Sequence, residues 1–446
     1  MVIVLRRPVS PRCDDLLPQL SHLSLTDRGP GAPAVPDEVS VSLTEIVSAA
    51  KEGLLAFAVG TGLQVMQQIM AEQVAALCGP PGKHNPERRG YRHGREAGSV
   101  TLGGRRVPIE RPRVRTADRS RELAVPAYEL FSGTELLGTM ALERMLAGLS
   151  TRRYQAGLEP VGGAVASKSS ATSRSAVSRK FVQATEHALA ELLAAPLAEL
   201  DLVALMVDGV HFADHCCVVA LGIDSTGRKH PLALEEGSTE NATLVRDLLV
   251  KLRDQRGLDV SRPILVVIDG ALALRSAVLD VFDQPVIQRC QLHKLRNVLD
   301  KLPERLRETV AGKMRRAYHA NSALEAEAQL SALGHELERT YPGAAASLRE
   351  GLAETLTVLA LEVPPTLART LRSTNAIESM IEICRDHSRN VKRWQDGAMV
   401  VRWCAAGMLE AKKQFRRVNG HLHLPALRAA LDQHVSTAIR YKGDAA

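Results

Sequence analysis

The sequence is poor in aromatic residues and in cysteine. Phe, Trp and Tyr make up only 3% of its 446 residues, and its seven cysteines are scattered and form no Cys-x-x-Cys pair. An odd, scattered set argues against a disulfide framework and against a four-cysteine zinc ribbon. We therefore expect a protein of a reducing compartment, the cytoplasm.

Long hydrophobic runs are missing as well. The most apolar stretch, residues 54–66, is too short to cross a bilayer and is interrupted by glycines and Gln64. The N-terminus has no apolar core of a signal peptide. We expect a soluble protein with no membrane partner.

Positive charge is present and unevenly distributed. Residues 83–121 hold 12 Lys and Arg against four acids, an excess larger than the net charge of +7 of the whole chain. A local excess of this kind indicates a polyanionic partner. The ordinary shares of hydrophobic residues (45%) and charged residues (24%) indicate a folded globular chain of two or three domains.

The first half of the chain falls into three segments. Residues 1–40 are rich in proline, and we expect a disordered arm there. Residues 41–82 carry apolar residues at helical spacing, which predicts one or two helices. Residues 83–190 combine a basic β-hairpin with two helices over 135–181, and the basic second helix suggests a helix-turn-helix-like DNA-binding region. An ordinary helical hairpin with solvated charges fits those two helices equally well.

Residues 201–300 carry the strongest fold signal. The expected strands are residues 202–212, 217–224, 230–236, 263–270 and 286–290, and the expected helices are residues 243–256 and 272–282. This order predicts an α/β fold, a ribonuclease-H-like mixed sheet in which the first and fourth strands lie side by side. An all-helical insertion is expected at 301–365. Residues 366–446 return to the catalytic core and add C-terminal helices.

Two acids end apolar strands of this predicted sheet. Asp208 and Asp269 are each followed by glycine. Burying an acid is costly unless a cation or hydrogen bonds compensate it, and two acids on adjacent strands repel each other. The pair therefore favours a divalent cation site, and Mg²⁺ suits its hard oxygen ligands. Taken singly, either acid could be a turn former at a strand end.

A third carboxylate is needed to hold two metal ions for phosphoryl displacement. The candidates near the helix that follows the insertion are Glu362, Glu378, Glu382 and Asp386. Glu378 lies on an early turn of this helix, and Arg385 lies two turns later on the same face, where it could hold a DNA phosphate. A solvated helix whose charges pair at spacings of three and four is the alternative.

A set of ordered motifs carries a family resemblance. The motifs are Val207 to Gly209, Gly237 to Asn241, Arg256 to Leu258, Val267 to Gly270, Gln288 to Asn297, Ser373 to Glu378 and Arg389 to Trp394. Together they resemble the Mutator-type transposases of bacterial insertion sequences, over roughly residues 50–430. These enzymes have a DDE catalytic core of ribonuclease-H-like fold with a helical insertion before the Glu. A departure is Val245, where many relatives have an aromatic residue.

The resemblance implies a catalytic and metal-binding triad of Asp208, Asp269 and Glu378. Two Mg²⁺ ions are expected, with Mn²⁺ able to substitute. Activated water would cut a phosphodiester at each end of the element, and the freed 3′-hydroxyl would attack the target. The implied partners are double-stranded DNA, as terminal inverted repeats and as target, and a second copy of the chain, since two DNA ends are handled together. When bound to DNA the protein would be associated with the nucleoid.

Several residues are candidates for DNA contact. They are Arg88, Arg89, Arg105, Arg106, Arg174, Arg179, Lys180, His293 and Arg385. Cys290 and His293 form a pair after the second acid, and two ligands are too few for a structural zinc site unless another pair joins them. We expect Cys290 to pack in the core and His293 to reach the edge of the active site or the DNA.

Two other functions remain open at this point. A metal-dependent nuclease or junction resolvase would share the triad chemistry and lack the joining step. A non-catalytic DNA-binding derivative could retain the three acids without using them.

Overall fold

The computed structural model describes residues 53–443, apart from short gaps at 84, 103, 134, 155–156, 159–160, 162, 172, 238 and 240. The expected arm at residues 1–40 lies outside the described residues, as does the start of the expected helical region after it. The described residues form two compact units: 53–96, 112–127 and 159–169 in the first, and 97–111, 128–158 and 170 onward in the second.

The N-terminal elements are one long helix and a basic hairpin. Helix α3 (Leu54–Cys78) is continuous and stops at Gly79, whose positive φ of 80° suits glycine. Strands β1 (Gly90–Leu102) and β2 (Arg105–Thr116) pair as the predicted hairpin, and the short strands β3 (Glu122–Leu123) and β4 (Ser170–Ala171) pair with β2. The hairpin prediction is confirmed.

The two helices predicted over 135–181 are present, but the short turn of a helix-turn-helix does not join them. The helices here are α4 (Pro126–Ser132), α5 (Glu135–Leu146), α6 (Gly163–Lys168) and α7 (Arg174–Ala194). Helices α5 and α7 do contact each other. However, residues 147–173 separate them in the chain, whereas a helix-turn-helix has a turn of three or four residues.

The second half of the chain is built on a five-stranded mixed sheet. Its strands are β5 (Leu202–Phe212), β6 (His215–Asp224), β7 (Lys229–Gly237), β8 (Ile264–Ile268) and β9 (Pro285–Arg289), in the order β7-β6-β5-β8-β9. The first three form an antiparallel meander, and β8 pairs in parallel with both β5 and β9. The predicted strand order, with the first and fourth strands side by side, is confirmed.

Helices cover both faces of this sheet. Successive side chains of each strand point to opposite faces, and both sets are apolar, so both faces must be buried. Leu205 and Val207 of β5 point to the core shared with α8 (Ala242–Asp254) and α9 (Leu272–Val281). Ala204 and Met206 point to the opposite core, shared with α17 (Asn375–Ser388) and α18 (Gly397–Gln414). Side chains of β5 at a spacing of two from Met206 therefore face α17.

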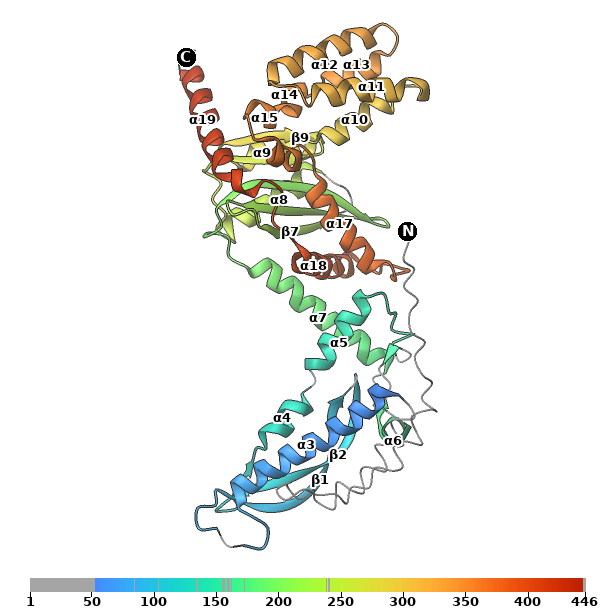
Figure 1. Ribbon diagram of the computed structural model, residues 1–446, viewed down its shortest axis with the longest axis vertical. Coiled ribbons are helices and arrows are strands. Elements are labelled where there is room, and N and C mark those ends of the chain that lie inside the picture. The colour runs from blue at the N-terminus through green and yellow to red at the C-terminus, as the bar shows by residue number, and fades with distance from the viewer. Residues whose placement is uncertain are drawn as a thin grey trace, which may run out of the picture. The chain divides into compact units, whose positions relative to one another are not determined.

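A helical region lies between β9 and α17 in the chain. Helices α10 (Gln291–Leu299), α11 (Glu304–Ala317), α12 (Ala323–Glu338) and α13 (Pro342–Arg349) share a hydrophobic core of their own. In Figure 1 they gather at one end of the sheet, in yellow and orange. The short helices α14 (Leu352–Thr355), α15 (Thr357–Ala360) and α16 (Pro365–Leu371) return the chain to the sheet. Residues 291–371, all of which the structure describes, contain no strand, as the sequence predicts.

The chain ends in the 3₁₀ turn η3 (His421–His423) and helix α19 (Leu424–Gly443). Within the described part of the chain, none of the helices is long and apolar enough to span a bilayer.

Candidate active site

The register of the central sheet places two acids opposite each other. In the parallel pair of β5 and β8, Met206 lies opposite Val267. Two residues further along the chain are Asp208, in β5, and Asp269, directly after the end of β8. Because they follow Met206 and Val267 at a spacing of two, we infer that both lie on the face covered by α17. Because neighbouring strands lie about 4.8 Å apart, the two carboxylates meet at one edge of the sheet.

Glu378 reaches the same edge from α17. It lies on the first turn of that helix, next to Ile377 and Ile381, which are buried in the core shared with β5. The charge of Glu378 contributes to the raised pKa of Asp208, after burial and the charge of Asp269. Of the other acids considered, Glu382 and Asp386 are exposed further along α17, and Glu362 is exposed before it.

Electrostatics at this edge favour a bound cation. Burial, followed by the neighbouring Asp269 carboxylate, raises the pKa of Asp208 to about 7. The raised pKa means that the ionised carboxylate is poorly solvated and repelled by a like charge. A bound divalent cation would offset this unfavourable free energy. The three acids offer only hard oxygen ligands, which Mg²⁺ prefers.

The Glu378 carboxylate is held by hydrogen bonding. Thr374 Oγ1, which is fully buried, donates to Glu378 Oε1 at 2.6 Å. His293 Nε2 lies 3.8 Å from the same oxygen, and His293 Nδ1 lies 3.4 Å from Thr374 Oγ1. The sequence analysis missed Thr374, although its position at the N-cap, four residues before Glu378, is a usable signal.

Cys290 and His293 form a polar pair behind Glu378. Burial alone would raise the pKa of Cys290, but hydrogen bonds with His293 and Thr374 outweigh burial and lower this pKa. The hydrogen bond with Cys290 in turn raises the pKa of His293 to about 9. Cys290 is fully buried, as expected, and His293 is half-buried beside Glu378.

Cys290, His293 and Glu378 also offer three candidate metal-ligand atoms within 4.8 Å of one another. Three protein ligands fall one short of a closed structural zinc site. Within the described residues this is the only such group of three or more His, Cys, Asp and Glu side chains.

The candidate DNA-contact residues lie in several places. Arg89, Arg174, Arg179 and Arg385 are exposed, and Arg88, Arg105 and Lys180 are half-buried. Arg88 stacks on Tyr91 with its guanidinium carbon 4.0 Å from the ring centroid. Arg88 and Arg89 belong to the first unit, and the other candidates belong to the second unit.

Arg106 makes its hydrogen bonds within the protein. It donates to the Ser132 carbonyl oxygen at 2.7 Å, to Ser99 Oγ at 2.6 Å and to Thr101 Oγ1 at 3.3 Å. These bonds join the hairpin to the end of α4, a structural role that the charge pattern alone does not reveal.

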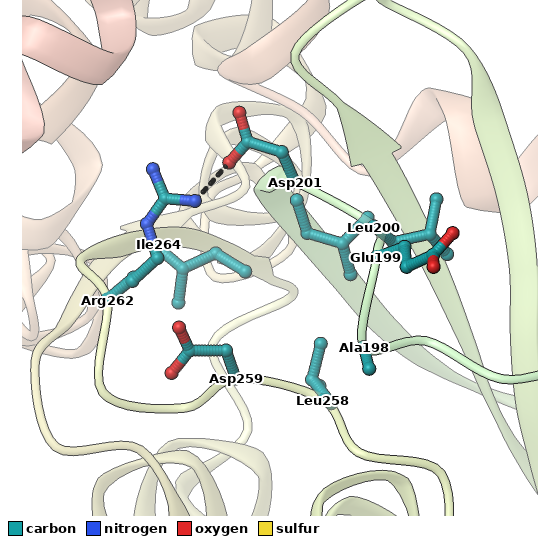
Figure 2. A pocket seen from close by; sticks show the side chains of 9 residues that line it. Ala198, Glu199, Leu200, Asp201, Leu258, Asp259, Arg262 and Ile264 are labelled. Carbon is teal, nitrogen blue, oxygen red and sulfur yellow. Dashed lines mark hydrogen bonds and ion pairs between the residues drawn. The ribbon is translucent and has the colours of Figure 1, made fainter.

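A small cavity lies away from the three acids. Figure 2 shows it beside the first residues of β5 and β8, at the opposite end of these strands. Asp201 and Arg262 line it and form an ion pair of 2.7 Å. The carboxylate cluster is therefore a separate site at the other edge of the sheet.

The sequence was compared with known families and proteins. A model of the Mutator family of transposases matches residues 39–418. The chain is 29% identical over 383 residues to the transposase for insertion sequence element ISRM5 of Rhizobium meliloti, covering 84% of this chain and 92% of the relative. It is 31% identical over 253 residues to the transposase for insertion sequence element IS6120 of Mycolicibacterium smegmatis, covering 55% and 75%. It is 25% identical over 316 residues to the transposase for IS256 in transposon Tn4001 of Staphylococcus aureus, covering 68% and 77%. The chain belongs to the Mutator family of transposases.

Proposed function

We propose that this protein is a DNA transposase that binds the terminal repeats of an insertion sequence and cuts and joins DNA strands with a DDE triad. The observation that carries the proposal is the position of Asp208 and Asp269 at the ends of the paired strands β5 and β8, on the face covered by the helix that carries Glu378. Membership of the Mutator family and the names of its relatives support the same activity. The strand order β7-β6-β5-β8-β9 supports a ribonuclease-H-like catalytic core.

The three carboxylates would hold two Mg²⁺ ions, with Mn²⁺ as a substitute. Their fit rests on oxygen-only ligands and on the raised pKa of Asp208, which results from burial first and from the like charge of Asp269 second. Two such ions supply activation of the attacking oxygen and charge stabilisation at the leaving oxygen. The protein's own contribution is to fix the ligands: β5 and β8 fix the two aspartates, and Thr374 and His293 orient Glu378.

The reaction would proceed in two steps at this one site. Water first attacks the phosphodiester at the end of the element and releases a 3′-hydroxyl. That hydroxyl then attacks a phosphodiester of the target, so the new bond replaces the old one and no covalent protein intermediate is needed. Both steps are in-line displacements at phosphorus that use the same ligands.

Arginines of both units would contribute DNA contacts. The basic hairpin and the exposed first turns of α7, with Arg174 and Arg179, are the proposed contacts to the terminal repeats. A homodimer or larger assembly on DNA would bring two ends together. Such a protein would work in the bacterial cytoplasm, associated with the nucleoid.

The proposal is tested by a strand-transfer assay with the purified full chain. The substrates are a labelled duplex of the terminal repeat that flanks the gene and a supercoiled plasmid as target. With Mg²⁺ we expect cleavage at the repeat end and labelled DNA joined to the plasmid, and neither product in EDTA. Cleavage without joining would identify a nuclease or resolvase. Binding without cleavage would identify a non-catalytic derivative.

A further inference from the structure

The last turns of α17 and the segment that follows it carry more positive than negative charge. The exposed cations there are Arg385, Arg389, Lys392 and Arg393. Within the described part of the chain none of these four side chains makes an ion pair. Glu382 and Asp386 are the exposed acids of α17 in the same stretch, so this surface keeps a net positive charge.

Hydrogen bonds to the last turn of α5 hold the segment that carries these cations. His387 Nδ1 donates to the Leu146 carbonyl oxygen at 2.8 Å, and Asn390 Nδ2 donates to the Met145 carbonyl oxygen at 3.0 Å. These carbonyls belong to the last turn of α5, where helix carbonyl groups lack partners within the helix. Inward side chains thus anchor the segment while its cations face outward.

Two more cations join the same surface. Arg152 and Arg153 are exposed in the turn after α5. On one side of this turn, the Leu149 carbonyl oxygen accepts from Asn390 Nδ2 at 3.3 Å. On the other side, Tyr154 is buried in a cluster against which Val391 and Trp394 pack. The turn is therefore fastened to residues 390–394 at both ends.

We propose that these six residues, Arg152, Arg153, Arg385, Arg389, Lys392 and Arg393, form a preformed basic ridge that binds the phosphate backbone of duplex DNA next to the active site. Arg385 lies seven residues after Glu378, which is about 10 Å along the helix, or roughly three base steps of B-form DNA. The ridge continues from there to Arg393. It thus receives the phosphates that follow the bond at the triad.

The chemistry of the ridge fits phosphate contact without base reading. Arginine presents a planar fork of donors that matches phosphate oxygens, and four of the five arginines lie within residues 152–153 and 385–389. The bonds of His387 and Asn390 hold the backbone of this segment, which lowers the entropy cost of ordering that backbone on binding. This inference depends on the proposed function only for the identity of the DNA. The experiment that tests it measures DNA binding and not DNA cleavage.

The test compares two triple variants of the full chain. R389Q/K392Q/R393Q removes three ridge charges, whereas K301Q/R305Q/R316Q removes three exposed charges from the helical insertion. Neither set makes an ion pair within the described residues, so the variants are matched in net charge and in exposure. The probe is a fluorescent duplex of the terminal repeat, titrated in EDTA at several salt concentrations.

We expect the ridge variant to bind about 10- to 100-fold more weakly at 0.1 M salt, with the slope of log K against log salt reduced by about 2 to 3. The insertion variant should keep the wild-type affinity and slope. R152Q/R153Q should reduce the slope by about 2 and provides an independent check. Equal binding by the ridge and insertion variants would overturn the ridge. Wild-type chain that binds through the ridge without cutting DNA would overturn the proposed function alone.

Discussion

At the scale of single residues, Thr374 is the clearest addition to the predicted triad. Its hydroxyl donates to Glu378 Oε1 at 2.6 Å and is fully buried, so it fixes the carboxylate before any ligand arrives. Thr374→Val has nearly the same shape and lacks this donor. We expect a roughly 10- to 100-fold loss of strand cleavage, because small misplacements of catalytic groups cost about this much.

Thr374→Ser keeps the donor and serves as the control. It should retain most of the cleavage activity, and both variants should bind the terminal-repeat duplex like the wild type. Equal cleavage by Thr374→Val and the wild type would show that this hydrogen bond does not position Glu378.

Asp224 provides a pH-dependent contribution to stability. It accepts hydrogen bonds from the backbone amides of Thr226 and Arg228 at 2.8 and 3.0 Å and from His230 at 2.8 Å. Burial alone would raise the pKa of Asp224, but these partners lower it below its ordinary value. The folded state therefore binds the Asp224 proton less readily than the unfolded state does. This stabilisation is complete above the ordinary Asp pKa near 4 and disappears as the pH falls through the lower folded pKa.

Asp224→Ala should accordingly lower the free energy of unfolding at pH 7 by about 2 kcal/mol, since it removes charged acceptors for several donors. Urea unfolding at pH 7 and at pH 3 measures the effect. We expect the difference between variant and wild type to shrink at pH 3. If the difference in unfolding free energy between variant and wild type were larger at pH 3 than at pH 7, the lowered pKa of Asp224 would be contradicted.

At the scale of elements, ion pairs that include the buried Arg289 join the helical insertion to the sheet. Glu354 of α14 accepts from Arg289 Nε of β9 at 2.7 Å and from Arg275 Nε of α9 at 2.6 Å. It thereby joins β9, which pairs with β8, to α9, the helix that follows Asp269 in the chain. Lys294, also buried, donates to the carbonyl oxygens of Ser347 and Glu350 at 2.7 Å each.

Glu354→Ala should destabilise the protein by about 3 kcal/mol, because it leaves the buried Arg289 guanidinium without its main partner. Glu336→Ala is the control: it breaks an exposed pair with Lys313 on the surface of the insertion and should cost less than about 1 kcal/mol. Thermal unfolding of both variants makes the comparison. Equal costs would indicate that Glu354 does not dock the insertion.

Elements with a strong apolar pattern were predictable from the sequence. The strands around Asp208 and Asp269 lie within a few residues of their predicted bounds, because continuous apolar runs must be buried on both faces. The connection between α5 and α7 was not predictable in the same way. The helical pattern shows that two helices exist, but not that residues 147–173 form further structure between them.

The candidate site was predictable only in part, because its partners come from distant parts of the chain. The two aspartates could be paired through strand order alone. The choice of Glu378 over Glu382 depends on the side of α17 that packs on the sheet, and a helical spacing of four leaves this open. The bonds of Arg106 to Ser132 and of Asn390 to Met145 depend on tertiary packing that local sequence does not encode.

At the scale of the whole molecule, separate parts of the chain would have separate tasks under the proposed function. The hairpin and the first turns of α7 would contact terminal repeats, the basic ridge would receive phosphates beside the triad, and the sheet with α17 would perform the chemistry. Binding and chemistry should therefore be separable by mutation. Variants of the triad should stop the reaction without weakening the contacts that the arginines make.

The central claim is that Asp208, Asp269 and Glu378 together carry out strand cleavage and joining. The most direct measurement is the strand-transfer assay with Asp208→Asn, Asp269→Asn and Glu378→Gln, with terminal-repeat binding measured in parallel. Asp214→Asn, at an exposed turn beside β5, is the matched control. We predict that each triad variant binds the repeat but yields neither cleaved nor joined DNA, while the control behaves like the wild type. Wild-type levels of joined product from any one triad variant would contradict the role of that residue and the account built on it.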